Sequence, residues 1–178
     1  ADLSAEQLKI NDSLIGTVQI SAEQNNLDPT INIGVSLTGN GNDAQVKGNY
    51  QLEKNEFDVR LDIQQMPLIL IDPFSAGAIQ KSQGYVAGKM TVRGTPDEPV
   101  VKGSLSFKQA STRIVYLQTR YTIAEHTIQI QKNSINFGQL QLQDLAGNKA
   151  SISGDIRHNN FQTFDLFLDF TTEKFKVL

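Results

Sequence analysis

Two alternating runs and the turn between them lie in residues 31–52, INIGVSLTGNGNDAQVKGNYQL. Apolar residues take every second position in residues 31–37, and again in residues 46–52 except that Gly48 takes one of these positions. A period of two is typical of a strand that turns one face to an apolar region and the other to water. The turn residues at 39–42, Gly-Asn-Gly-Asn, favour a tight hairpin. This stretch therefore predicts two neighbouring antiparallel strands.

The same alternation continues through most of the chain. It recurs in residues 14–20, 57–63, 90–92, 101–107, 140–142, 150–156 and 164–170. Short turn signals stand at residues 54–55, 132–133, 146–148 and 158–160. Short links between consecutive strands favour antiparallel neighbours. We therefore predict one all-β module over residues 1–178, an antiparallel meander with at most one or two short helices.

Two segments depart from this pattern. Residues 67–83 have the apolar spacing of a short helix or an irregular crossover, in which Asp72 would be the N-cap and Pro73 the first helical residue. The opening residues 4–7, Ser-Ala-Glu-Gln, fit either a capping box or a frayed strand.

Glycine recurs on the apolar face of the predicted strands. A glycine followed by apolar residues at alternate positions begins at Gly16, Gly48, Gly88 and Gly103, with a shortened copy at Gly154. Glycine weakens a strand, so its repeated use on one face indicates a bend or a close approach of another segment.

Composition excludes several classes of protein. The net charge is −3 and the 16 basic residues are scattered, so we expect no nucleic-acid partner. No cysteine is present, which excludes disulfides and thiolate metal sites. The longest apolar run, residues 66–71, is far too short to cross a bilayer and contains Pro67. The chain begins without methionine and ends abruptly, so we interpret it as a segment of a longer protein.

Residues with catalytic potential are few and separated. Adjacent strand residues point to opposite faces, so Glu125 and His126 are not expected to form a dyad, and His158 falls in a predicted turn. The loop at 39–43 has one carboxylate, too few ligands for calcium. We expect no enzyme, no cofactor and no metal site.

A family resemblance rests on residues 66–110, MPLILIDPFSAGAIQKSQGYVAGKMTVRGTPDEPVVKGSLSFKQA. The features that carry it are Gly84-x-x-x-Gly88, the run Val92-Arg93-Gly94-Thr95, Pro99, and Gly103-Ser104-Leu105. The segment at 147–154 fits the same family. In these features the chain resembles the C-terminal region of TamB, the translocation and assembly module subunit, which is itself related to AsmA-like bridge-like lipid-transfer proteins.

The resemblance implies a fold, a location and partners. It implies a β-taco, a sheet folded lengthwise into a trough with an apolar concave face. It implies a periplasmic segment of a parent protein anchored in the inner membrane of a Gram-negative envelope, with a TamA or BamA-type outer-membrane barrel as partner. The trough would hold phospholipid acyl chains, or apolar β-strands of unfolded outer-membrane proteins, during transfer between the membranes.

Two hypotheses remain open for the apolar face: an open trough that binds a client, and a closed structural or adhesive β-sandwich spacer without a ligand. No convergent charges for a lipid headgroup are visible along the chain. Candidate residues for the lining of a groove are Val18, Ile33, Val35, Tyr50, Val59, Leu61, Met90, Val92, Leu105, Phe107, Leu140, Ile152, Leu166 and Leu168.

Overall fold

The computed structural model describes residues 1–10, 13–24, 29–75, 77, 79–116, 118–160 and 162–172. Its elements are β1 (Asp2–Ile10), β2 (Ser13–Gln24), β3 (Thr30–Gly39), β4 (Asn42–Gln51), β5 (Glu56–Pro67), the 3-10 helix η1 (Leu68–Ser75), β6 (Ile79–Gly94), β7 (Pro99–Ile114), β8 (Thr119–Ile123), β9 (His126–Gln131), β10 (Ser134–Gln143), β11 (Lys149–Asn159) and β12 (Thr163–Thr172).

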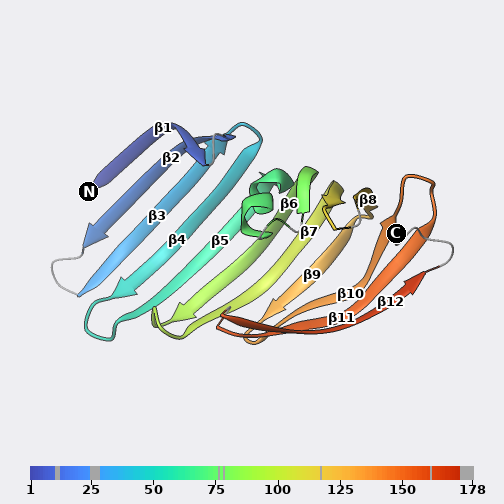
Figure 1. Cartoon of the computed structure of the whole chain (residues 1–178). Helices are drawn as coiled ribbons and strands as arrows, with labels where there is room; N and C mark the ends of the chain where they lie inside the picture. The colour runs from blue at the N-terminus through green and yellow to red at the C-terminus, as the bar shows by residue number, and fades with distance from the viewer. Residues whose placement is uncertain are drawn as a thin grey trace. The chain divides into compact units, whose positions relative to one another are not determined.

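The strands pair in the order of the sequence. The order in the sheet is β1 to β8, then β10, β11 and β12, while β9 pairs with β10 and β7 (Figure 1). Short links between most consecutive strands explain this order, since they favour antiparallel neighbours, whereas β5 and β6 are joined through η1. Between β3 and β4, Asn40 and Gly41 both have positive φ, 49° and 82°, which is the conformation of a type I′ hairpin turn. The predicted all-β antiparallel meander is confirmed.

The chain divides into two compact units. Unit 1 comprises Ala1–Met66 and Gly88–Gly103, and unit 2 comprises Pro67–Ala87 and Ser104–Leu178. The long strands β6 and β7 contribute residues to both units. Each unit is described by itself below.

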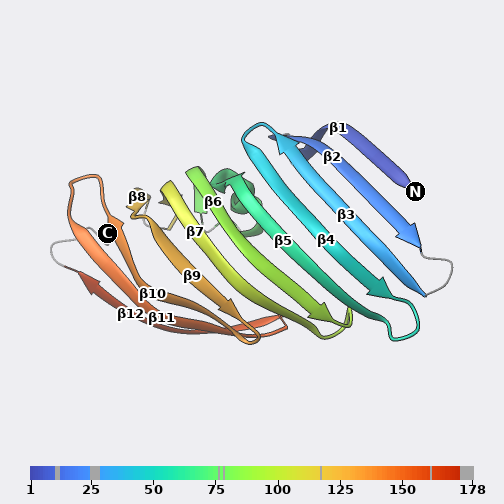
Figure 2. The same ribbon diagram turned by 180° about the vertical axis from the view of Figure 1, so that it is seen from behind.

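Unit 1 is built around one extended run of in-register strands. From β1 to β5 each strand pairs antiparallel with the next, and β2 to β5 lie side by side in both views (Figure 2). Residues 4–7 belong to β1, so the strand interpretation of this segment is confirmed and the capping box is wrong. Among the described residues, no helix is long and apolar enough to span a membrane.

Unit 2 contains a small core on one face of its strands. Tyr121 of β8 packs with Leu140 and Leu142 of β10 and Ala150 of β11, all buried. Phe107, Ile114, Ile123, Phe137 and Ile152 pack around them and stay partly exposed. The face that carries Tyr121 and Leu140 is called the apolar face of unit 2.

The helix η1 differs from the predicted one at its start. It begins at Leu68, so Asp72 and Pro73 lie inside it and the predicted cap is wrong. The Asp72 carboxylate instead accepts hydrogen bonds from the backbone N–H of Ser82, at 3.0 Å, and from the Ser82 hydroxyl. Ser82 also bonds Thr112, whose cross-strand partner is Tyr121. Because cross-strand partners share a face, η1 is fastened to the apolar face of unit 2.

His158 is also placed differently from its prediction. It belongs to β11 and is buried, and its ring lies 6.2 Å from that of Phe164 in β12, centroid to centroid. The turn begins only after Asn159, where β11 ends. The sequence predicts a turn over His158-Asn159-Asn160, but imidazole is amphipathic and packs in a strand as readily as it lies at a surface.

Burial raises the pKa of the Tyr121 phenol, and the nearby Asp144 carboxylate adds to the effect while a hydrogen bond with Thr119 opposes it. The unfolded chain, with an ordinary tyrosine pKa near 10, then loses this proton at lower pH than the native protein. The contribution of Tyr121 to stability should therefore be intact below about pH 10 and decline above it, at up to about 1.4 kcal/mol per pH unit.

We expect the Tyr121→Phe variant to lose less stability than the parent chain as the pH rises above that value. Urea unfolding at a series of alkaline pH values measures the difference. Parallel pH curves for the two proteins would contradict the prediction.

Candidate binding face

The apolar face of unit 1 is formed by rows of apolar side chains that run across the strands. One row crosses five strands, because each member is the cross-strand partner of the next: Leu3, Ile20, Val35, Val46 and Leu61. Directly opposed residues in a sheet share a face, so a row in register makes a continuous apolar surface. This surface is called the apolar face of unit 1.

Two further rows lie on either side of the first. One joins Val18 with Leu37, Ala44 and Ile63, and the other joins Ile33 with Gly48 and Val59. Tyr50 stands between Ile31 and Phe57 in the next row. The predicted lining residues of β2 to β5 are therefore brought together on one surface.

On the apolar face of unit 1, Ala44 and Ile63 are buried, whereas the row from Leu3 to Leu61 is only partly buried. Its side chains would be almost inaccessible if a second sheet packed on them, as in a sandwich core. Instead Leu3 is 70% exposed and Ile20 39% exposed, and Val35, Val46 and Leu61 are all half-buried. Lateral contacts between neighbours in the rows give this intermediate burial, while the outward side stays accessible. An exposed apolar surface of this extent is typical of a binding site.

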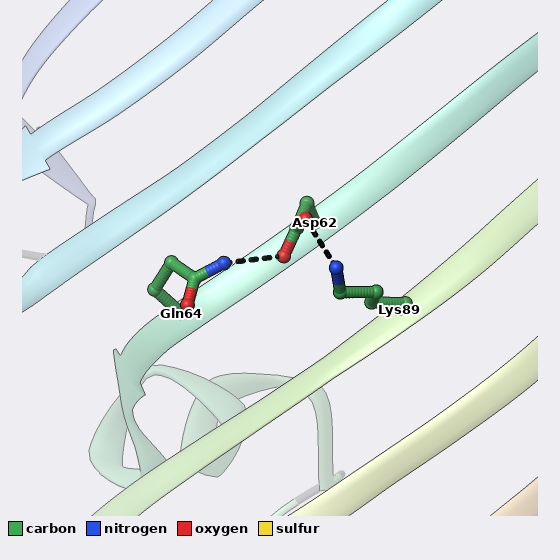
Figure 3. Close-up of polar contacts among 3 residues, drawn as sticks. All are labelled: Asp62, Gln64 and Lys89. Carbon is green, nitrogen blue, oxygen red and sulfur yellow. Dashed lines mark hydrogen bonds and ion pairs between the residues drawn. The ribbon is translucent and has the colours of Figure 1, made fainter.

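The opposite face of unit 1 is polar. Asp62 of β5 forms an ion pair with Lys89 of β6 at 3.1 Å and accepts a hydrogen bond from Gln64 at 2.8 Å (Figure 3). Asp58 forms a second ion pair with Arg93 at 3.0 Å. Such exposed pairs contribute little stability, but they fix which face of β6 is polar. Met90 and Val92 alternate with Lys89 and Arg93 and therefore lie on the apolar face.

The remaining candidates belong to unit 2 and differ in burial. Leu140 is buried in the core, and Phe107 and Ile152 pack against it. Leu105 is half-buried and alternates with Phe107 on β7. Leu166 and Leu168 of β12 are 66% and 37% exposed. The open part of this face is therefore on β12, where Phe164 and Phe170 are exposed as well.

Sequence reasoning missed Leu3, the most exposed large apolar residue of the row, because residues 4–7 left the strand character of this segment undecided. Its position two residues before Ala5 is a weak signal of alternation.

Glu125 is exposed between β8 and β9, and the Nε2 atom of half-buried His126 contacts the Phe137 carbonyl oxygen. In the described parts of the chain no group of three or more His, Asp or Glu side chains is placed to hold a metal ion.

Comparison with known proteins identifies one family. The family model described as the TamB C-terminal domain matches residues 33–141, which is more than half of the chain and includes β4 to β9. No curated protein and no solved structure matches the chain.

Proposed function

The chain belongs to the TamB C-terminal domain family, and from this premise we propose that its apolar sheet face holds phospholipid acyl chains during transfer between the inner and outer membranes. TamB-family proteins act in biogenesis of the Gram-negative envelope, in the context of outer-membrane assembly. The observation that carries the proposal is the five-strand apolar row from Leu3 to Leu61, in register and partly exposed.

An acyl chain suits this face better than an extended polypeptide does. The inner strands β2, β3 and β4 are paired along both edges, so their faces present apolar side chains and no free backbone groups. A polypeptide laid flat on such a surface would bury N–H and C=O groups without partners, which costs free energy. An acyl chain has no such groups, so its contact with the face carries no such cost.

The strength of the interaction indicates what shape the site needs. Covering ten methylenes contributes about 8 kcal/mol when burial is complete and about 4 kcal/mol when one side of the chain stays open. The lower value corresponds to about millimolar affinity. A single open face would therefore hold lipid only briefly. We propose that the sheet folds lengthwise into a trough, so that a chain contacts two apolar walls.

A second candidate is suggested by β12, whose apolar side chains are exposed and which is the last strand in the sheet order of the described residues. A strand of an unfolded outer-membrane protein could pair with this edge and place its own apolar side chains on the same face. This client would use backbone hydrogen bonds that an acyl chain cannot make.

The proposal concerns a carrier and includes no catalytic step. It places the chain in the periplasm, as part of a parent protein anchored in the inner membrane and working with a TamA or BamA-type barrel. Family membership supports this placement.

Lipid extraction tests the proposed function. The chain is purified without detergent from a Gram-negative host, extracted with organic solvent and examined by mass spectrometry. We expect bound phospholipid. Recovery of apolar peptides without phospholipid would favour the strand client, and a preparation free of both would favour the closed spacer without a ligand.

A further inference from the structure

Three basic residues that are scattered in the sequence meet at one corner of unit 2. Arg113 of β7 and Arg120 of β8 are direct cross-strand partners. The Arg120 guanidinium donates to Ser111 Oγ and to the Lys81 carbonyl oxygen of β6, both at 2.9 Å. Lys81 itself is exposed. The carbonyl contact places the Lys81 backbone beside Arg120, so three neighbouring strands each carry one basic residue here, and the three residues are called the basic corner.

None of the ion pairs between described residues includes Lys81, Arg113 or Arg120. The Asp144 carboxylate, which lies near Tyr121 beside Arg120, is bonded within its own loop to Ala146 and Asn148. The Asp72 carboxylate accepts its hydrogen bonds from Ser82 on the apolar face of unit 2, which is opposite to the face of Arg113 and Arg120. Like charges placed directly across a strand pair destabilise the sheet. The repulsion between Arg113 and Arg120 is relieved when an anion binds between or beside them.

Exposed apolar side chains project from the same edge of unit 2, the one at which β7 ends and β6 and β8 begin. The β7–β8 hairpin closes with a turn in which the Gln118 N–H donates to the Val115 carbonyl at 3.1 Å, and Tyr116 in this turn is 85% exposed. Leu145, in the loop that follows β10, is 79% exposed. Its loop reaches the same edge, because Gln143 at the end of β10 pairs with Thr122 of β8.

The loop that carries Leu145 is held in a defined shape. The Asp144 carboxylate accepts hydrogen bonds from the backbone N–H groups of Ala146 and Asn148, both at 2.9 Å, and from the Asn148 side chain at 3.0 Å. A carboxylate that is satisfied in this way orders the turn. Leu145 is therefore exposed on a loop whose backbone is held by Asp144.

We propose that this edge of unit 2 docks on the surface of an anionic phospholipid bilayer. Tyrosine is enriched at the level of lipid headgroups because its ring is apolar and its hydroxyl is polar. Cations beside it are attracted by anionic headgroups. Single exposed apolar side chains, Tyr116 and Leu145, next to the basic corner fit the headgroup region of a bilayer better than they fit the flat core of a protein interface. The inference extends the proposed lipid-binding function and uses different residues.

Vesicle co-sedimentation of the whole chain tests the inference. We expect binding to vesicles that contain phosphatidylglycerol, weak binding to phosphatidylcholine alone, and a decline with added sodium chloride. Arg113→Gln should lower the partition coefficient about fivefold and the double Arg113→Gln, Arg120→Gln variant about 25-fold, at one cation's contribution each. Tyr116→Ser should weaken binding to both kinds of vesicle. Lys102→Gln, which removes an exposed lysine of unit 1, should change it less than about twofold.

Several outcomes would overturn the inference. Equal binding to both vesicle types would show that charge plays no role. If Lys102→Gln lowered the partition coefficient as much as Arg113→Gln does, the effect would come from the net charge of the chain and not from the basic corner. Full competition by inorganic phosphate would assign the basic corner to a free anion. Absence of binding would leave an acidic protein as the partner of this edge.

Two controls make the outcomes distinguishable. The first tests whether a variant is misfolded, and the second distinguishes failure of the proposed lipid binding from failure of vesicle docking. Arg113→Gln removes a repulsion, so its thermal stability should equal or exceed that of the parent chain. A charged residue on the apolar face of unit 1 should abolish lipid retention without reducing vesicle docking. Arg113→Gln should reduce vesicle docking without reducing lipid retention.

Discussion

Replacing Leu61 by aspartate should lower the amount of copurified phospholipid at least about tenfold while the chain stays folded. Leu61 of β5 is the last member of the apolar row that runs through Val35 and Val46. A carboxylate there interrupts the apolar surface that an acyl chain would cover, and covering it without a partner costs more than the chain gains. Since Leu61 is only half-buried, water can still hydrate the carboxylate when no lipid is bound.

The matched control for this variant is Arg60→Gln, the preceding residue on the opposite face of β5. Both substitutions change the net charge by −1, so a general electrostatic effect should appear in both. Lipid in the extract is measured by mass spectrometry, and folding by far-ultraviolet circular dichroism and urea unfolding. If Leu61→Asp simply unfolds the chain, Leu61 belongs to a closed core and the open-face proposal is wrong.

Replacing Gly48 by alanine should destabilise the chain by about 2–3 kcal/mol, the cost of forcing extra atoms into a packed region. A Cβ atom at Gly48 would lie 2.1 Å from the Asp58 carbonyl oxygen and 2.5 Å from the Val59 Cα atom. Both atoms belong to the backbone of β5, so the two strands would have to separate. The prediction that glycine on the apolar face marks a close approach is confirmed at this position.

Gly34→Ala is the control for Gly48→Ala, because it adds the same methyl group to the neighbouring strand. Its Cβ atom would meet only the Ser21 hydroxyl, at 2.6 Å, which can rotate away. Its stability should change by less than about 0.5 kcal/mol, and a small gain is possible because alanine restricts the unfolded chain. Urea unfolding of the two variants measures the contrast. Equal losses would show that the backbone of β5 yields to a methyl group.

The strands could be predicted because their pattern is local. In β3, β4 and β5 one face is apolar and the other polar, and short turns with Asn and Gly leave few ways to connect them. The helix η1 was predicted with the wrong start, because its pairing of Asp72 with Ser82 depends on a residue ten positions away. His158 was assigned to a turn by its neighbours in the sequence, whereas its position is set by pairing with Phe164 of the next strand.

The candidate binding face was likewise predictable from the sequence only in part. Alternation places Val35, Val46 and Leu61 on apolar faces of their own strands, but only the register puts them in one row. The basic corner had no signal at all in the sequence. Lys81, Arg113 and Arg120 are separated by up to 39 positions and come together because three strands start or end at the same edge.

By itself the sequence determined the all-β class, the antiparallel order and the existence of an apolar and a polar side to each strand. These properties follow from the two-residue period of the extended backbone and from turn chemistry, both of which act within a few residues. Only the tertiary structure decided which apolar residues share a surface, that the row from Leu3 to Leu61 is partly exposed, and that three distant basic residues lie at one corner of unit 2. Register and burial decide these properties, since both depend on contacts between residues far apart in the chain.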